Sequence, residues 1–120
     1  MMRIKHWLLS VLSGLILVGG TYAFAQEATF ETHTTASCTN STSEALASNE
    51  GRISALLVND GTSTIWIKVN EAAVANEGIR LNANGGSYYI SMGEGNLDRE
   101  AVNCITASAT VVLLVTEWSN

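Results

Sequence analysis

The sequence is short of the side chains that most catalytic sites need. Its 120 residues include two histidines, two cysteines and no proline, and no C-x-x-C pair occurs. His6 lies in the first few residues, which leaves His33 as the single imidazole of the remaining chain. Catalytic triads, dyads and histidine-based metal sites therefore lack members. The sequence predicts a protein that is not an enzyme and that needs no metal and no cofactor.

Basic residues are also scarce. Six Lys and Arg residues stand against eleven Asp and Glu residues. Arg3 and Lys5 belong to the extreme N-terminus, so the chain beyond residue 25 keeps four basic and eleven acidic residues, a net charge of −7. A chain this acidic repels phosphate backbones and anionic membrane surfaces. The composition argues against nucleic acid as a partner.

The N-terminal residues have the pattern of an export signal. Arg3 and Lys5 precede an almost unbroken apolar run from Trp7 to Val18, and Ala23-Phe24-Ala25 is the small-x-small sequence that signal peptidases recognise. An uncleaved anchor is the alternative, but the run is shorter than the roughly 20 residues of a transmembrane helix. We expect removal of residues 1–25 and a secreted or periplasmic bacterial protein with no membrane association.

Both cysteines, Cys38 and Cys104, lie in the exported part, where disulfides form. Two thiolates without a nearby histidine cannot complete a tetrahedral zinc site. We therefore expect one structural disulfide. Because it closes most of the mature chain into a loop, it should stabilise the fold by about 4 kcal/mol on the loop-closure model.

The clearest fold signal runs from Ile53 to Asn70. Two runs rich in β-branched and aromatic residues, Ile53 to Val58 and Thr64 to Val69, flank the pair Asp60-Gly61. Such a pair supplies the positive φ angles of a tight turn. The second run alternates apolar and polar residues, as a half-buried strand does. This pattern predicts a β-hairpin.

The segment before this hairpin, residues 26–52, is expected to hold an N-terminal strand and a connector. Residues 28–35 alternate and are rich in threonine, which is typical of an edge strand able to pair with a neighbouring chain. A frayed terminus is the alternative. Residues 36–51 are rich in Ser, Thr and Asn and are expected to form a loop, with a helical turn at 43–47.

The segment after the hairpin continues with strand signals up to the C-terminus. We expect a helical turn at 71–77, a second hairpin over 78–92 and a strand over 100–106. Residues 110–118 are apolar on both faces, which is typical of a central strand covered on both sides. Residues 53–120 should thus form the core of an all-β domain, a small antiparallel β-sandwich of about seven strands or a partly open barrel.

The stretches VNDGTSTIWIKVNEAAVANEGIRLNANGGSYYI and AVNCITASATVVLLVTEW carry a family likeness. They resemble the small β-modules of tailed-phage structural proteins, such as head-fibre, decoration and tail-associated proteins. The resemblance covers about half of the chain and implies a structural or surface role. The export signal and the two cysteines differ from that family and indicate the same type of module used outside a bacterial cell.

Three side chains are candidates for ligand binding. Trp66 shares a strand face with Lys68, and Tyr89 lies on the polar face of its own strand. Such aromatics could bind a glycan or a protein. The alternative is that Trp66 and Tyr89 cover the second face of a sheet.

The acidic loop Glu94-x-Asn96-x-Asp98-x-Glu100 offers oxygen ligands at alternate positions but matches a calcium loop poorly. Arg99 stands where an EF-hand has its invariant glycine, and Ile105 where it has its bidentate glutamate. Asp98 and Glu100 are also the nearest candidates for an acid–base pair.

The sequence therefore favours a non-enzymatic structural or assembly component of an extracellular or periplasmic surface structure. Its expected partner is protein, including a second copy of itself through edge strands. A carbohydrate-binding or adhesion domain is the alternative, and a small hydrolase or inhibitor is a third.

Overall fold

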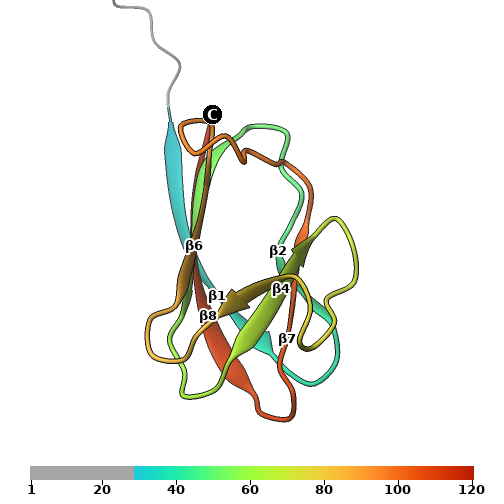
Figure 1. Ribbon diagram of the computed structural model, residues 1–120. Coiled ribbons are helices and arrows are strands. Elements are labelled where there is room, and N and C mark those ends of the chain that lie inside the picture. Colours follow the sequence, from blue (N-terminus) through green and yellow to red (C-terminus); the bar gives the residue numbers. More distant parts are fainter. Residues whose placement is uncertain (1–28) are drawn as a thin grey trace, which may run out of the picture.

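The computed structural model describes residues 29–120; the expected signal peptide lies outside these residues. The described chain folds into eight β-strands (Figure 1). Within residues 29–120 no helix is long and apolar enough to cross a membrane. The strands are β1 (Phe30–Cys38), β2 (Ser43–Leu46), β3 (Arg52–Asn59), β4 (Ile65–Val69), β5 (Ile79–Leu81), β6 (Ser87–Ser91), β7 (Val102–Ile105) and β8 (Val111–Ser119).

The strands form two four-stranded antiparallel sheets. The first sheet has the order β1-β8-β3-β6 and the second the order β2-β7-β4-β5. Only β4 and β5 are neighbours both in sequence and in a sheet; each other connection crosses between the sheets. This is the strand order of a jelly roll, a sandwich of two four-stranded sheets. The expected all-β antiparallel sandwich is confirmed.

The eighth strand, beyond the seven expected, is β2. It was expected to be a helical turn within the connector, yet it lies in the second sheet and pairs with β7. Ser43 and Leu46 are opposite Cys104 and Val102, with a register shift between Glu44 and Leu46. Because four residues are too few for a stable helix, the pairing with β7 decides the conformation.

The predicted hairpin over Ile53 to Asn70 is wrong. Strand β3 pairs with β6 and β8, whereas β4 pairs with β5 and β7 in the opposite sheet. The buried Asn59 explains the crossing: its amide nitrogen donates to the carbonyls of Ser63 and Leu81, and its oxygen accepts from the Gly61 N–H. The turn is therefore an arch between sheets, and a Cβ at Gly61 would collide with the Val111 side chain.

The second predicted hairpin and the helical turn before it are also wrong. Strands β5 and β6 lie in different sheets. Residues 71–77 form the loop of the β4–β5 hairpin instead of a helical turn. Asn70 and Asn76 have positive φ angles of 61° and 66°, which a right-handed helix does not contain. The turn residues predicted where the chain reverses direction, but they did not predict which sheet each strand would join.

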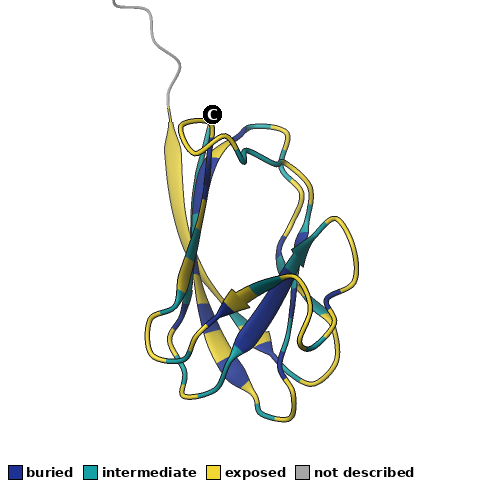
Figure 2. Ribbon diagram, in the orientation of Figure 1, coloured by how far each residue is buried: buried dark blue, intermediate teal, exposed yellow. Residues whose placement is uncertain are grey.

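The core lies between the two sheets, and the alternation of β8 shows which sides of the strand are covered (Figure 2). Val111, Leu113 and Val115 point inward and are buried. Val112 and Leu114 point outward and are 42% and 37% exposed. Strand β8 is central in its sheet, as expected, but the expectation that it is covered on both sides is wrong. The first sheet has a packed layer on one side only.

A buried arginine closes one end of the sandwich. Arg52, at the start of β3, is 0% exposed and forms an ion pair of 2.6 Å from its Nε to a carboxylate oxygen of Glu117. One terminal guanidinium nitrogen donates to the carbonyls of Asp98 and Glu100, and the other donates to the carbonyl of Ala47. The guanidinium thus joins β3 and β8 to two loops that lead into the second sheet.

A β-bulge aims this arginine inward. The register of β3 with β8 shifts between Arg52, opposite Ser119, and Ser54, opposite Trp118. Such a bulge places one extra residue in one strand. Ile53, the extra residue, turns outward and is 38% exposed, while Arg52 turns toward the interior. A strict alternation would have exchanged these two residues.

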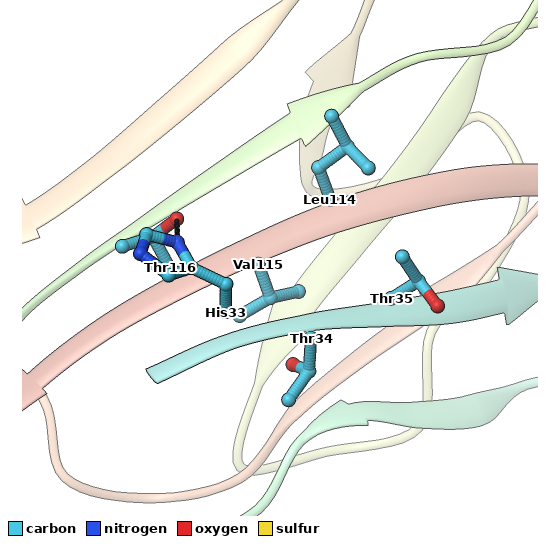
Figure 3. A pocket seen from close by; sticks show the side chains of 6 residues that line it. All are labelled: His33, Thr34, Thr35, Leu114, Val115 and Thr116. Carbon is cyan, nitrogen blue, oxygen red and sulfur yellow. Dashed lines mark hydrogen bonds between the residues drawn. The ribbon is translucent and has the colours of Figure 1, made fainter. Parts of the chain in front are cut away.

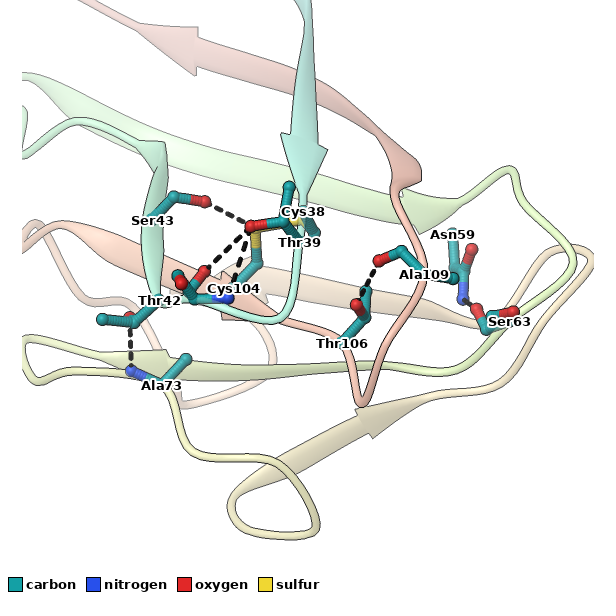
Figure 4. Close-up of a disulfide and its surroundings, with 11 residues drawn as sticks. Cys38, Thr39, Thr42, Ser43, Asn59, Ser63, Ala73, Cys104, Thr106 and Ala109 are labelled. Atoms are coloured by element: carbon teal, nitrogen blue, oxygen red, sulfur yellow. Dashed lines mark hydrogen bonds between the residues drawn. A yellow bond between two sulfur atoms is a disulfide. The ribbon is translucent and has the colours of Figure 1, made fainter.

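The predicted disulfide between Cys38 and Cys104 is confirmed (Figure 4). It joins the end of β1 in the first sheet to β7 in the second, with Cα atoms 5.6 Å apart and a sequence separation of 66. Both cysteines are 0% exposed. Because Cys38 is opposite Val111 and Arg52 opposite Ser119, the disulfide and the arginine lie at opposite ends of β8.

We predict that Arg52→Met lowers the free energy of unfolding by about 3–5 kcal/mol, because Glu117 and the carbonyls around the guanidinium lose their partner in a buried site. Urea denaturation followed by tryptophan fluorescence measures this change. Arg80→Met, on the exposed side of β5, is the matched control and should stay within about 0.5 kcal/mol of wild type. Equal effects of the two substitutions would contradict the role given to Arg52.

We also predict that the double substitution Cys38→Ala/Cys104→Ala costs about 4 kcal/mol, since it restores the entropy of the unfolded chain. Denaturation of the oxidised protein, of the reduced protein and of the double variant measures this cost. Reduction should have little further effect on the variant. A variant as stable as the oxidised protein would show that the bond contributes nothing.

Candidate functional site

The candidate site is the free edge of β1 in the first sheet. Residues 30–35 are exposed on both faces of this strand, and Figure 2 shows the exposure over most of its length. Phe30 is 62% exposed. Only Ala36 and Cys38 are partly or fully covered. A nine-residue strand at a sheet edge with so little cover is unusual, because bare edges promote association with other chains.

The register identifies which backbone groups of β1 are free. In an antiparallel strand the N–H and C=O of one residue point to one side and those of the next residue to the other. The Val112 carbonyl accepts from the Asp60 N–H, which follows β3, so the even-numbered residues of β8 face β3. Its odd-numbered residues therefore bond the even-numbered residues of β1, as in the pair Thr34 and Val115.

The odd-numbered residues of β1 then point their backbone groups away from β8. These residues are Glu31, His33, Thr35 and Ser37. Within residues 29–120, β1 pairs with β8 alone, so no second strand takes up these groups. Four consecutive bonding positions of one strand edge thus lack a partner strand.

The opposite edge of the same sheet, on β6, is closed by one asparagine. The Asn96 side chain donates to the Tyr89 carbonyl at 2.8 Å and accepts from the Ser91 N–H at 2.9 Å. The Asn96 backbone N–H also donates to the Ser91 carbonyl. The register of β3 with β6 places these groups of Tyr89 and Ser91 on the free side of β6. Asn96 therefore occupies the positions that an added strand would use.

The edges of the second sheet are short. Strand β2 has four residues and β5 has three. The Leu81 carbonyl at the end of β5 also accepts a hydrogen bond from the Asn59 side chain. Short edges are one way in which proteins limit unwanted strand addition. Among residues 29–120, β1 alone offers a long edge without such protection.

A shallow hollow of about 550 Å³ lies along the pair β1 and β8 (Figure 3). In Figure 3 Leu114 and Thr34 project to opposite sides of this pair. His33 Nδ1 lies 2.9 Å from the Thr116 hydroxyl, and its Nε2 lies 2.8 Å from a Glu31 carboxylate oxygen. Both side chains are exposed, so the contact between His33 and Glu31 contributes little to stability. The hollow is an open surface feature and not an enclosed ligand site.

The structure separates the three predicted ligand-binding residues. Trp66 and Lys68 lie on β4 in the second sheet, whereas Tyr89 lies on β6 in the first. Trp66 is only 9% exposed and lines a cavity of about 290 Å³ with hydroxyl residues of neighbouring loops. Tyr89 is 43% exposed and makes an edge-to-face contact with Trp118, with ring centroids 6.4 Å apart. The residues do not form one patch.

Lys68 is held by carboxylates of the β4–β5 loop. Its Nζ lies 2.9 Å from Glu77 and 3.5 Å from Glu71. The hydrogen bond to Glu77 raises the pKa of Lys68 above its usual value, with a smaller electrostatic contribution from Glu71. Lys68 therefore holds the β4–β5 loop in place, and its charge is already paired with Glu77 and Glu71.

The acidic residues of the 93–100 loop have structural contacts. Asp98 accepts a hydrogen bond from the Glu100 N–H, and the carbonyls of both residues bind Arg52. Asn96, the second residue of the calcium-like pattern, covers β6. Over residues 29–120 no three His, Cys, Asp or Glu side chains gather where they could hold a metal ion.

Comparisons with known proteins find a similar fold but show no family for this chain. No protein-family model and no curated protein matches the sequence. A solved structure of Bacillus endospore appendages, described as a novel family of disulfide-linked pili, matches with a TM-score of 0.50 and 13% identity over 78% of this chain and 87% of its own. A de novo designed double-stranded β-helix matches with a TM-score of 0.40 and 15% identity over 75% and 99%.

At 13% identity the first match shows a shared fold and nothing more. The description of that match does not concern a phage protein, so the resemblance to phage structural modules stays a prediction. Both the buried Arg52 and the edge-covering Asn96 were missed from the sequence. The one signal for each residue was its position: Arg52 begins an apolar strand, and Asn96 lies in the loop that follows an edge strand.

We predict that Asn96→Ala lowers the free energy of unfolding by about 0.5–1.5 kcal/mol, because its hydrogen bonds to the β6 edge are lost. The Ser91 amide should also exchange faster with deuterium, since its acceptor is gone. Hydrogen-exchange NMR and urea denaturation measure the two effects. Asn82→Ala, in the exposed loop between β5 and β6, is the control and should leave the Ser91 amide unchanged. Unaltered exchange in the Asn96 variant would contradict the edge-covering role.

Proposed function

We propose that this chain is a non-enzymatic structural component of an extracellular or periplasmic surface structure, and that it assembles through the free edge of β1. The observation that carries the proposal is the asymmetry of the first sheet. One edge is covered by Asn96, while the other presents Glu31, His33, Thr35 and Ser37 to solvent. An extended segment that adds to such an edge gains main-chain hydrogen bonds along its whole length.

The joint between subunits is non-covalent. The chain has only two cysteines, and both are consumed in the bond inside one subunit. The fold is shared with an appendage protein that its description calls disulfide-linked. Because Cys38 and Cys104 are fully buried and paired, subunits of this protein must hold together through backbone pairing and surface contacts.

The disulfide supports a location outside the cytoplasm. Disulfides persist in oxidising compartments. The export pattern of residues 1–25 points to the same place, with the mature chain secreted or periplasmic.

The glycan-binding alternative has less support. Stacking on a sugar needs an exposed aromatic face. Trp66 offers little of its surface, and Tyr89 lies on the other sheet against Trp118. Lys68 is already engaged with Glu77. We therefore rank assembly first and glycan binding second.

We predict that the oxidised chain from residue 26 onward forms multimers and that Thr35→Pro weakens them about tenfold or more, a change of about 1.4 kcal/mol. Proline removes an N–H that faces away from β8, so the fold keeps its own bonds while the free edge loses a donor. Light scattering over a concentration series measures the mass in solution.

Thr35→Val is the matched control, because it keeps the N–H and should keep the multimers. Deletion of residues 26–35 should abolish them, with circular dichroism verifying that the rest of the sandwich remains folded. A monomeric wild-type chain would overturn the proposal. In that case glycan screening of Trp66→Ala against wild type would test the alternative.

A further inference from the structure

The proposed assembly does not say which strand of a neighbouring subunit pairs with β1. The lengths of the strands that could pair leave few candidates. Satisfying all four free positions, residues 31–37, takes a partner strand of about seven residues. On a second copy of this chain, β3, β4, β7 and β8 already have neighbours on both sides. Of the edge strands, β2, β5 and β6 have four, three and five residues, and β6 is covered by Asn96. Only β1 is long enough.

We infer that two copies pair through their β1 strands in an antiparallel arrangement, with the two-fold axis at Thr34; this rests on the proposed assembly function. The axis at Thr34 is the centre of the free positions, so Glu31 pairs with Ser37 of the partner subunit and His33 pairs with Thr35 of the partner subunit. Each of these free N–H and C=O groups then has a counterpart.

Charge supports this orientation and register. In a parallel, in-register pair Glu31 would lie opposite the partner's Glu31, and like charges directly opposite each other are destabilising. An antiparallel axis at His33 would place two imidazoles opposite each other. With the axis at Thr34, each glutamate lies opposite a serine and the two threonines at the axis form a favourable cross-strand pair.

The surroundings of β1 leave room for a second strand. Residues 30–35 are exposed on both faces, so neither the second sheet nor a loop covers them. Pairing would join the two first sheets into one continuous sheet with both outer faces on the same side. Such a contact is isologous and closes on itself, so the product is a dimer that serves as the unit of any larger assembly.

A single engineered cysteine tests the register. Thr34 is even-numbered and bonds β8, so at the axis it forms a non-hydrogen-bonded pair with its own copy, with Cα atoms about 4.5 Å apart. This spacing suits a disulfide. We expect oxidised Thr34→Cys protein to become mainly covalent dimer, measured on non-reducing gels and by intact mass, with peptide mapping to verify that Cys38–Cys104 is retained.

Thr32→Cys is the matched control. It lies on the same face of β1 and is equally exposed, but here it is opposite Ala36 of the partner subunit. The two engineered sulfurs would then be separated by four residues along the strand, about 13 Å, too far for a bond. Cross-linking of Thr34→Cys without cross-linking of Thr32→Cys supports the inference.

The remaining outcomes separate this inference from the function on which it rests. Efficient cross-linking of Thr32→Cys overturns the register. A multimeric wild-type chain whose Thr34→Cys variant stays uncross-linked overturns the β1–β1 pairing and leaves the assembly function intact. A monomeric wild-type chain overturns both.

Discussion

The buried guanidinium of Arg52 is the constraint on which the closed end of the sandwich depends. A charge with no exposed surface is tolerated only when it is paired and hydrogen-bonded. Arg52 meets this condition with one carboxylate, Glu117, and carbonyls from two separate loops. Those loops lead into the second sheet, so satisfying one side chain fixes the path of the backbone at three places. The β-bulge at Ile53 is needed for these contacts, because without it the Arg52 side chain would point to solvent.

The two ends of the sandwich are held by different chemistry. At the Arg52 end the sheets are joined by charge-assisted hydrogen bonds, and at the other end by the bond between Cys38 and Cys104. Between them the core of residues 29–120 is made of small and medium aliphatic side chains, with the half-buried Tyr88 packed against it, while the buried Trp66 lies outside this cluster. A sandwich as small as that of residues 29–120 buries a modest core, so covalent and ionic anchors at its ends carry a large share of its stability. With these anchors in place, β1 is not needed to cover the interior along its exposed half.

The sequence allowed the fold class, the disulfide and the edge position of the strand that begins at Phe30 to be predicted, because each follows from local pattern or from compartment. The partner of each strand could not be predicted. Asp60-Gly61 reverses the chain equally well in a hairpin or in an arch, and the choice depends on the Asn59 side chain, whose acceptor at Leu81 is 22 residues away. The predicted grouping of Trp66 and Tyr89 failed for the same reason, because their strands, β4 and β6, joined different sheets.

The two edges of the first sheet argue for function more strongly than any one residue does. Exposed strand edges are a hazard, and the same sheet shows how the hazard can be removed: one asparagine, Asn96, closes β6 with three hydrogen bonds. The β1 edge has no bulge, no proline and no inward charge along Glu31 to Ser37. A sheet that protects its five-residue edge and leaves its nine-residue edge bare supports the proposed pairing at the longer one. Because the two cysteines are bonded to each other inside the subunit, the proposed pairing would be reversible, with a strength set by backbone hydrogen bonds and by the threonine-rich faces beside them.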